Sequence, residues 1–518
     1  MMREVTPKRL IPQVSSWEKA VGCVAPGLAK KIYQTRCAFA MTEAYHGASK
    51  TRKSMTGLNA PSGDFNTDVL PELETLRENS EHLYRNNMLA AGGINAKAIS
   101  VIGRGLTAQP RIDAEYLGMS EEAAEKLEAH VARRWAMFSE SKFCSINKRH
   151  NFRQIISLGY LSSLIRGDSF LLTPEKEKLN YFPFKLRLQL VEADRVCNAD
   201  NVADDKNLAG GIQTDDNGAP LYVHIRTSHP GSMVDTELKW QRVRWIGEKT
   251  GRRNVLQFYK PVRVDGHRGV PLLAPVIEGL KQFSTLTQAT IDAAVVQTFL
   301  SVLIETPSGD PIPLESGNST NSVKLDAAAI IDLAEGEKPH VINPTHPNSN
   351  YPLFYDKFTT QLGAAIGVPK EVIEKYFQSS YTAAQGALLE AWREFTMERW
   401  RIIDDICQPV YELWLAGEVA DGEIIMPGFF SSPDIRAAYS GVDWAGPPRG
   451  HIREDIQNKA DGYAEDRGWK TSEQNTQERG SRWERNLRQR KKEIQSKIDA
   501  GITEDPNAKQ QDITAQVN

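Results

Sequence analysis

The stretch RNNMLAAGGINAKAISVIGRGLTAQPRID, Arg85–Asp113, contains a match to the G-x-G-x-x-A pattern of dinucleotide-binding loops at Gly103–Ala108. Such a loop follows a strand and opens a helix, because the phosphate binds at the helix N-terminus. Here the order is reversed. An apolar stripe at helical spacing precedes Gly103, formed by Ala90, Ile94, Ala98, Val101 and Ile102. Gln109-Pro110 follows at once, so Gly103 and Gly105 predict a helix stop and disfavour a nucleotide site.

The composition is that of a globular protein of several domains. The chain has 518 residues, of which 40% are hydrophobic and 25% charged, and its net charge is -3. This length suits about three domains of roughly 150 residues. The acidic balance argues against nucleic-acid binding over the whole surface, although a local basic patch stays open. We expect neither a signal peptide nor a membrane span, because no sufficiently long apolar run occurs.

The five cysteines do not indicate a disulfide framework or a zinc site. Their number is odd, and no two have C-x-x-C spacing. We therefore expect scattered thiols in a reducing compartment. The set is Cys23, Cys37, Cys144, Cys197 and Cys407.

Residues 1–80 show weak periodicity, and His46–Asp68 is rich in Gly, Ser, Thr, Asn and Lys. This predicts a loosely structured N-terminal arm, either disordered or gripping a neighbouring subunit. Apolar spacing of three to four residues predicts the helices that follow. They run from Glu72 through the stripe that ends at Ile102, from Glu121 to Met137, and from Phe152 to Ile165, where Gly167 breaks the last one.

Residues 168–265 predict a mostly antiparallel β region. The runs DSFLLTPE and FKLRLQLVEADRV alternate apolar and polar side chains, as half-buried strands do. Asn217-Gly218 lies between two further alternating runs. This pair predicts a tight hairpin with positive φ at both central positions.

Three helices are expected after the β region. The first runs from Pro275 to about Glu305, with proline in its first turn. A stretch rich in helix breakers follows. The second helix runs from Tyr351 to Gly367, and the third runs from Tyr381 to Leu415 with an interruption near Gln408-Pro409.

The C-terminal segment is polar and basic. Glu478–Lys497 contains eight Lys or Arg residues and three Glu residues. Trp483, Leu487, Ile494 and Ile498 keep helical spacing. Two interpretations are open: an amphipathic helix that packs on a neighbour, or a surface that attracts phosphates at the mouth of a DNA passage.

No motif predicts catalysis, a metal or a cofactor. The sequence contains no P-loop, H-E-x-x-H or G-x-S-x-G motif. The stretch DDNG is similar to a calcium loop, but the twelfth position from Asp215 is Arg226 instead of glutamate. His340 and His346 lie in a proline-rich stretch, where solvent exposure is favoured over metal binding.

The stretch LRENSEHLYRNNMLAAGGINAKAISVIGRGLTAQPRID resembles the N-terminal block of lambda-type tailed-phage portal proteins. Further similar segments follow in the family's order: IRGDSFLL, LRLQLVEADRV, GIQTDDNGAPLYVHI, LQFYKPVRVDGHRGVPLLAPVIEGLKQF, LGAAIGVPKEVI and SSYTAAQGALLEAWREF. The resemblance spans about Glu72–Phe395. The motif positions it marks as structural are Arg85, Asn86, Asn87, Gly103, Gly105, Gly167, Asp168, Glu192, Asp194, Arg195, Gly367 and Pro369.

The sequence departs from the family pattern in three places. Val264-Asp265-Gly266 stands where the family often has a glutamine, and Ala384-Gln385 replaces the usual Ala/Ser-Arg pair. HIREDIQ stands where the family often has I-D-P. These departures affect the detail expected of the inner channel and of the crown.

The resemblance implies an α+β portal fold in a ring-forming subunit, with an α/β wing, a long helical stem, a small clip and a helical crown. Its expected division is an N-terminal arm at 1–71, wing at 72–273, first stem helix at 274–305, clip at 306–350, second stem helix at 351–366, tunnel loop at 367–382, wing and channel helices at 383–450, and crown with polar tail at 451–518.

The resemblance also implies a function. Twelve copies would form a ring at one capsid vertex, through which double-stranded DNA passes during packaging and ejection. The ring would dock the terminase large subunit, head-completion or tail adaptor proteins, and the major capsid or scaffolding protein. The subunit would belong to the virion, be assembled in the host cytoplasm and hydrolyse no ATP. The alternatives are a nucleotide-dependent enzyme that processes nucleic acids and a regulatory DNA-binding module.

Within this division, GVPKEVIEKYFQSSYT at Gly367–Thr382 is the expected tunnel loop. Its charged residues are Lys370, Glu371, Glu374 and Lys375, and their charges sum to zero. A nearly neutral lining would hold DNA weakly and let it slide, whereas a cationic lining would grip phosphates. With Tyr376, these four residues are the expected channel-lining set.

Overall fold

The computed structural model describes residues 16–40, 53–55, 57, 62–234, 238–298, 302–305, 338–341, 350–376, 381–447, 454–479, 481 and 483–500. The chain divides into two compact units, residues 1–63 and 64–518. The first unit holds α1 (Ser16–Val24) and α2 (Pro26–Ala40), which contact each other. These helices differ from the loosely structured arm expected over 1–71. Alanine, lysine and glutamine in α2 favour a helix by propensity, without a clear apolar stripe. Much of His46–Asp68 lies outside the described residues.

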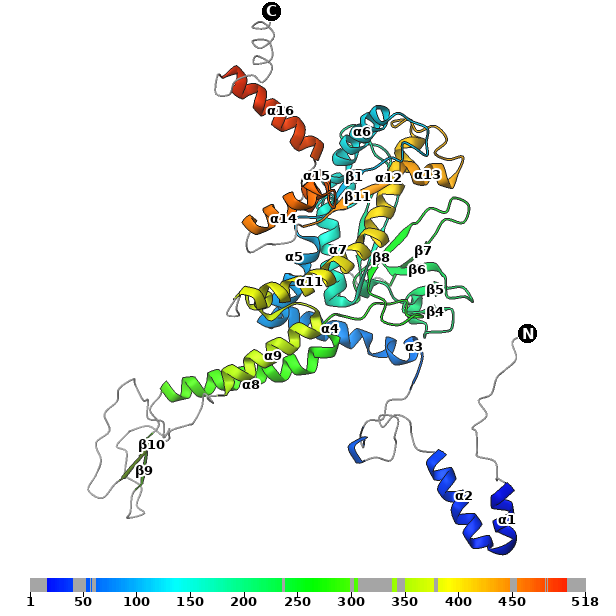
Figure 1. Cartoon of the computed structure of the whole chain (residues 1–518), viewed down its shortest axis with the longest axis vertical. Coiled ribbons are helices and arrows are strands. Elements are labelled where there is room, and N and C mark those ends of the chain that lie inside the picture. The colour runs from blue at the N-terminus through cyan, green and yellow to red at the C-terminus, as the bar shows by residue number, and fades with distance from the viewer. Residues whose placement is uncertain are drawn as a thin grey trace, which may run out of the picture. The chain divides into compact units, whose positions relative to one another are not determined.

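The second unit opens with helices (Figure 1), and all but the short α3, which lies in the segment expected to be loosely structured, are at predicted positions. They are α3 (Phe65–Asp68), α4 (Leu70–Asn86), α5 (Met88–Ile102), α6 (Glu121–Ser139) and α7 (Phe152–Arg166). Asn87 separates α4 from α5 and caps α5 by accepting a hydrogen bond from the Ala90 amide. Gly167 ends α7 with φ 91°, as predicted.

The named strands of the β region pair antiparallel, as predicted, and an isolated parallel bridge joins Leu188 to Ser145. One sheet has the order β3-β2-β8, and the other has the order β4-β5-β6-β7. A second hydrophobic core, which includes Phe170, Ile212 and Val255, joins the two. The strands are β2 (Asp168–Leu172), β3 (Gln189–Glu192), β4 (Leu208–Ala209), β5 (Ile212–Thr214), β6 (Pro220–Arg226), β7 (Trp240–Arg244) and β8 (Val255–Tyr259).

The hairpin at Asn217-Gly218 exists, but its predicted turn type is wrong. Gly218 has φ 84°, while Asn217 does not have positive φ. The Asp215 carboxylate accepts the backbone N–H groups of Asn217 and Ala219, so the connection is longer than two residues. A register shift next to Thr214 absorbs the extra residue.

Two antiparallel helices, which follow the β region in the sequence, form an arm. They are α8 (Ile277–Thr298), entered through a 3-10 turn at Ala274–Val276, and α9 (Tyr351–Ile366). They lie side by side (Figure 1), with the ring of Phe283 stacked on Phe358 at 4.4 Å between centroids. The Thr287 and Tyr351 hydroxyls also bond, which fixes the antiparallel direction.

The expectation of one helix to Glu305 is wrong. The helix ends at Thr298, and β9 (Val302–Glu305) pairs antiparallel with β10 (Lys338–Val341). A short apolar run fits either period, and the partner strand that decides lies far along the chain. Within the expected clip, residues 306–337 and 342–349 lie outside the described part of the chain.

The helix predicted from Tyr381 is interrupted where expected. It consists of α11 (Tyr381–Ile402), a π-helical turn at Ile403–Cys407, and α12 (Gln408–Ala420). The π turn ends two residues before Pro409, which has no N–H to donate to the preceding turn. The remaining elements are α10 (Lys370–Glu374), α13 (Pro433–Tyr439), α14 (Glu454–Asp466), α15 (Ser472–Glu478) and α16 (Trp483–Asp499).

An aromatic cluster forms the centre of the main core. Trp135 of α6 meets Phe152, Tyr411 and Trp414 edge-on at 5.3, 5.2 and 5.1 Å between ring centroids. It also meets Trp444 of β11 (Val442–Ala445), which pairs with β1 (Thr107–Pro110). The cluster therefore joins α6, α7 and α12 to a sheet whose two strands lie far apart in the sequence. None of the helices in the described ranges is long and apolar enough to cross a membrane.

Candidate functional site

Gly103 and Gly105 form a helix stop and not a phosphate loop. Their φ values are 55° and 108°, and the Gly105 amide donates to the Ile102 carbonyl at 2.9 Å. A Cβ on Gly105 would lie 2.8 Å from the Cβ of Arg153. The stretch is the C-terminal end of α5, whose exposed carbonyls would repel a phosphate. The prediction of a helix stop is confirmed.

Asp168, at the G-D motif position, is the centre of a buried charge network. Its side chain is inaccessible to solvent and accepts from Arg268 Nε at 2.7 Å, Arg268 Nη2 at 3.1 Å and Arg77 Nη2 at 3.0 Å. The Gly269 amide and the Gln257 side chain donate to the same carboxylate at 3.0 and 3.2 Å. Burial acts to raise the pKa of Asp168, but the two arginines lower it overall. The carboxylate is therefore ionised and joins α4, β2 and β8.

Glycines allow the chain to approach itself at this network. A Cβ on Gly269 would lie 2.0 Å from the carbonyl oxygen of Gly167, and a Cβ on Gly167 would lie 2.2 Å from that of Gly269. These glycines let the segment that carries Arg268 lie directly against the start of β2. The sequence marked Gly167 and Asp168 as motif positions but did not indicate their partners.

The other motif residues surround the network. Asp194 pairs with Arg166 and lies 3.8 Å from Arg77 Nη1, while Arg195 donates to the carbonyls of Arg226 and Thr227 at 3.0 and 2.9 Å. Glu192, next to them at the end of β3, has a side chain that is 60% exposed.

The R-N-N motif lies where α4 turns into α5. The side-chain amide nitrogen of Asn87, Nδ2, donates to Ser284 Oγ of α8 at 2.7 Å, and this bond joins the base of the arm to α5. Asn86 donates to the His82 carbonyl at 3.0 Å, and Arg85 pairs with Glu81. Asn87 thus has two roles, capping α5 and holding α8.

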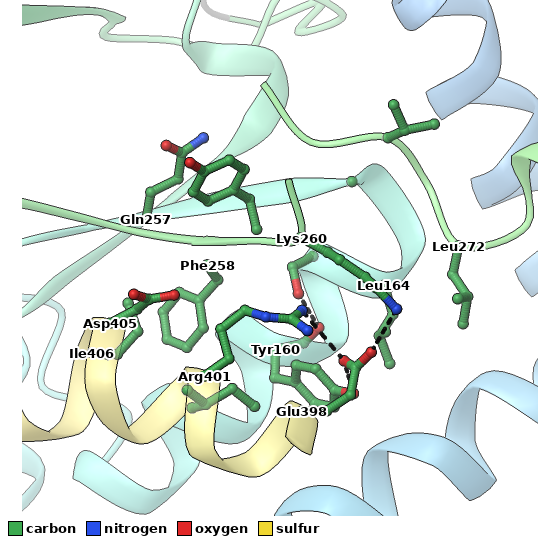
Figure 2. Close-up of a pocket in the computed structure, with 15 residues that line it drawn as sticks. Tyr160, Leu164, Gln257, Phe258, Lys260, Leu272, Glu398, Arg401, Asp405 and Ile406 are labelled. Carbon is green, nitrogen blue, oxygen red and sulfur yellow. Dashed lines mark hydrogen bonds and ion pairs between the residues drawn. The ribbon is translucent and has the colours of Figure 1, made fainter. Parts of the chain in front are cut away.

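A pocket lies between α7, β8 and α11 (Figure 2). Figure 2 shows the Glu398 carboxylate between Lys260 and Tyr160; Lys260 Nζ donates to it at 3.0 Å and Tyr160 Oη at 3.1 Å. The cavity volume is about 50 Å³. One water needs about 10–15 Å³ on such a measure, so the pocket holds a few waters and not a nucleotide.

The charges lining the pocket neutralise one another. Burial acts to raise the pKa of Glu398, but Lys97, Lys260 and Arg401 lower it overall. Burial also raises the pKa of Tyr160 well above its usual range, and Glu398 adds to the effect. The phenol therefore stays protonated and donates to an ionised carboxylate. This arrangement stabilises the packing of α7 against α11 and supplies no activated nucleophile.

Lys97 connects this network to the end of the arm. Its side chain is 1% exposed, and Nζ donates to the Ile366 carbonyl at 2.8 Å and to Glu394 Oε1 at 2.7 Å, with Glu398 at 3.8 Å. The ammonium thus caps the C-terminus of α9, where a cation is favoured. The sequence analysis missed this residue, although a lysine within the apolar stripe of α5 is the signal that could have found it.

The expected tunnel residues follow the end of α9. Gly367 has φ 72°, and a Cβ there would lie 2.0 Å from Glu394 Oε1. Pro369 precedes α10, so part of the expected loop is helical. Lys370 pairs with Asp356 of α9, which raises the pKa of Lys370 and lowers that of Asp356.

The five expected channel-lining residues do not share one environment. Lys375 and Tyr376 are exposed at the end of α10, whereas Lys370, Glu371 and Glu374 are half-buried. The apolar Ile373 of α10 packs on α5 near Gly93. All five residues lie in α10 or directly after it, and Lys375 and Tyr376 are the most exposed of them. Residues 377–380 lie outside the described part of the chain.

The remaining sequence features are the candidate metal ligands and the basic C-terminal segment. In the described part of the chain, no group of three His, Cys, Asp or Glu side chains could hold a metal ion. The basic C-terminal segment is a helix, α16, in which Leu487 and Ile494 are 52% and 46% exposed. This confirms the helical stripe, and neither of its two interpretations is tested.

Comparisons with known proteins identify a family. The family model described as phage portal protein, lambda family, matches residues 51–399. Portal protein B of Escherichia phage lambda is 24% identical over 78% of this chain and 80% of its own length. The portal protein of Escherichia phage N15 is 23% identical over 78% and 81%.

Among solved structures, a chain from the virion of a native gene transfer agent particle has a TM-score of 0.45 and 12% identity, covering 77% of this chain and 89% of its own. A chain from the neck of the native particle has a TM-score of 0.45 and 12% identity, covering 79% and 92%. The family model covers well over half of this sequence, and it includes the helix stop, the Asp168 network and the arm. The chain therefore belongs to the lambda family of phage portal proteins.

Proposed function

We propose that this portal protein assembles into a closed ring of twelve copies at one vertex of a phage capsid and conducts double-stranded DNA. The arm formed by α8 and α9 carries the proposal. Its outward residues Leu286, Ile291, Leu353 and Phe354 are 42%, 51%, 62% and 48% exposed. Exposed apolar side chains on one part of the molecule favour a protein neighbour. A heterologous contact repeated around an axis closes into a ring.

The charge of the arm suits a passage for DNA. Only three of the 22 residues of α8 and two of the 16 residues of α9 are charged. Their charges sum to -1, because Glu278 and Asp292 outweigh Lys281 in α8, and Asp356 balances Lys357 in α9. Grip on DNA comes from cations that neutralise phosphates, so a nearly neutral arm would retain DNA weakly.

In this proposal the arm is the stem, 306–350 is the clip and 367–382 is the tunnel loop. Residues 72–273 and 383–450 form the wing and channel helices, and 451–518 form the crown and tail. The ring belongs to the virion, is assembled in the host cytoplasm, and docks the terminase large subunit, adaptor proteins and the capsid or scaffolding protein. The subunit itself hydrolyses no nucleotide.

Negative-stain electron microscopy of the purified protein tests the ring. We expect closed rings with a central hole, and their loss in the double variant Ile291→Asp and Leu353→Asp. The matched control is Ile425→Asp, which changes an apolar side chain that is 80% exposed and does not belong to the arm. Rings that persist in the arm variant would contradict the role of the arm. Nucleotide hydrolysis by the wild-type protein would favour the enzyme alternative instead.

The tunnel assignment has its own test. Replacing Lys370 and Lys375 with glutamate should change DNA retention or packaging yield without blocking ring assembly, because a more acidic lining repels phosphates. Lys370→Glu also places a carboxylate against Asp356, so Lys375→Glu alone separates the channel effect from a local one. Unchanged retention and packaging in both variants would exclude these residues from the channel lining.

A further inference from the structure

The outer face of the sheet that contains β6 and β7 carries a cluster of cations. The register places His224 opposite Arg242, Tyr222 opposite Arg244, and Arg226 opposite Trp240. Alternate residues of a strand share one face, so all six side chains lie on the same side of the sheet. Val223, Ile225 and Val243 occupy the other side, against the second core. We call the six residues the β6–β7 face (strands in Figure 1).

The guanidinium groups on this face are held in place. Arg242 lies 3.7 Å from the centroid of the Tyr222 ring and donates from Nη2 to Gln213 Oε1 at 2.8 Å. Arg244 lies 5.5 Å from the same ring and pairs with Glu248 at 3.0 Å. An arginine stacked on an aromatic ring keeps its N–H groups free at the edge for an oxyanion. The pair with Glu248 shows that a carboxylate fits beside this face.

Two side chains on the face have polar atoms without a hydrogen-bond partner among the described residues. They are both ring nitrogens of His224 and Nε of Arg226, and all three atoms are enclosed. Burial and the nearby Arg242 lower the pKa of His224, so its ring is neutral at neutral pH. Enclosed polar groups are usually hydrogen-bonded, so these atoms indicate an ordered water beneath the face. The exposed guanidinium groups of Arg242 and Arg244 are the ones that a partner can reach.

The connection between β6 and β7 adds exposed apolar residues. Met233, Val234 and Leu238 are 95%, 98% and 59% exposed. Apolar residues beside arginine and aromatic side chains are typical of protein interfaces. A surface that binds nucleic acid instead depends on many phosphate contacts, and Glu248 would oppose them.

We propose that the β6–β7 face is a docking surface for an acidic segment of a partner protein, whose carboxylates bind Arg242 and Arg244 and whose apolar residues cover Met233 and Val234. The inference goes beyond the conduit role and does not require a ring. Each subunit presents the surface by itself.

The test is fluorescence anisotropy with the full-length chain and a labelled peptide in which glutamate residues alternate with Leu-Ser pairs. We expect the peptide to bind, and Arg242→Gln to weaken its binding at least tenfold, which is about 1.4 kcal/mol. The matched control is Lys249→Gln, which removes an exposed cation from the turn after β7 and should change binding less than twofold. The same peptide with Gln in place of Glu should not bind.

Two further measurements keep the test decisive. Met233→Ser should weaken binding as well, and because its side chain is almost fully exposed, the variant folds normally. A 20-base-pair DNA duplex should bind no more weakly to Arg242→Gln than to the wild type. The proposal is overturned if the acidic peptide binds Arg242→Gln as tightly as it binds the wild type. It is also overturned if DNA, and not the peptide, depends on Arg242.

Discussion

Replacing Asp168 with asparagine should destabilise the second unit by about 3–5 kcal/mol, the usual loss when one partner of a buried ion pair is removed. The asparagine would keep the shape of the side chain but not its charge. Arg77 and Arg268, which are 6% and 3% exposed, would then be buried cations without this counter-ion. Burial and Arg268 already lower the pKa of Arg77 to about 10, and Asp168 opposes that shift. Because domains are stable by only about 5–15 kcal/mol, the loss is a large fraction.

Urea unfolding followed by tryptophan fluorescence measures this loss. Trp245 lies 6.3 Å from Phe170 in the second core and reports on the β region. The matched control is Asp216→Asn, an 81% exposed carboxylate on the β5–β6 turn, whose unfolding midpoint should not move. An Asp168→Asn midpoint equal to that of the wild type would refute the reasoning, because the network would then contribute no net stability.

The pH dependence of the free energy of unfolding tests the same variant in a second way. The pKa of Asp168 in the folded protein lies below its ordinary value of 3.8. The carboxylate therefore contributes stability that is fully present above pH 3.8 and is lost as pH falls through the folded pKa. The difference between wild type and Asp168→Asn should be constant at neutral pH and shrink in acid. A difference that grows in acid would contradict the assigned shift.

Two more substitutions test the close approach and the link to the arm. Gly269→Ala should prevent soluble expression, because the new Cβ would lie 2.0 Å from the Gly167 carbonyl oxygen. The control Gly386→Ala has open space around it in α11 and should raise stability by about 0.5–1 kcal/mol. Equal expression yields and equal unfolding midpoints for the two variants would contradict this. Lys97→Met should speed hydrogen exchange at the C-terminal end of α9, because the buried ammonium no longer holds the Ile366 carbonyl. The control Met233→Ser replaces an apolar side chain that is 95% exposed, and it should leave that exchange rate unchanged.

Local patterns predicted most of the elements. The apolar stripe before Gly103 predicted α5 and its end, because helical period and positive φ are properties of a few neighbouring residues. The alternating runs after Gly167 predicted the antiparallel strands for the same reason. The predicted helix to Glu305 was wrong because the choice between helix and strand there depends on β10, which lies over thirty residues away.

The candidate site was predictable only in part. Motif resemblance marked Asp168 and Asp194 but not Arg77 or Arg268, because no local pattern shows which arginine is buried. Lys97 was missed for the opposite reason. Its neighbours read as a plain apolar helix, and a lysine there is ordinarily at the surface.

The sequence by itself determined the family, most of the helices and strands between Glu72 and Leu415, and several of the points at which they end. These depend on residues close together in the chain. Only the tertiary structure decided which charges neutralise one another. Arg77, Asp168 and Arg268 meet across about 90 and 100 residues of chain, and β1 pairs with β11 from the far end of the unit. A buried charge is stable only beside its counter-ion, and which residue becomes that counter-ion is fixed by how the elements pack.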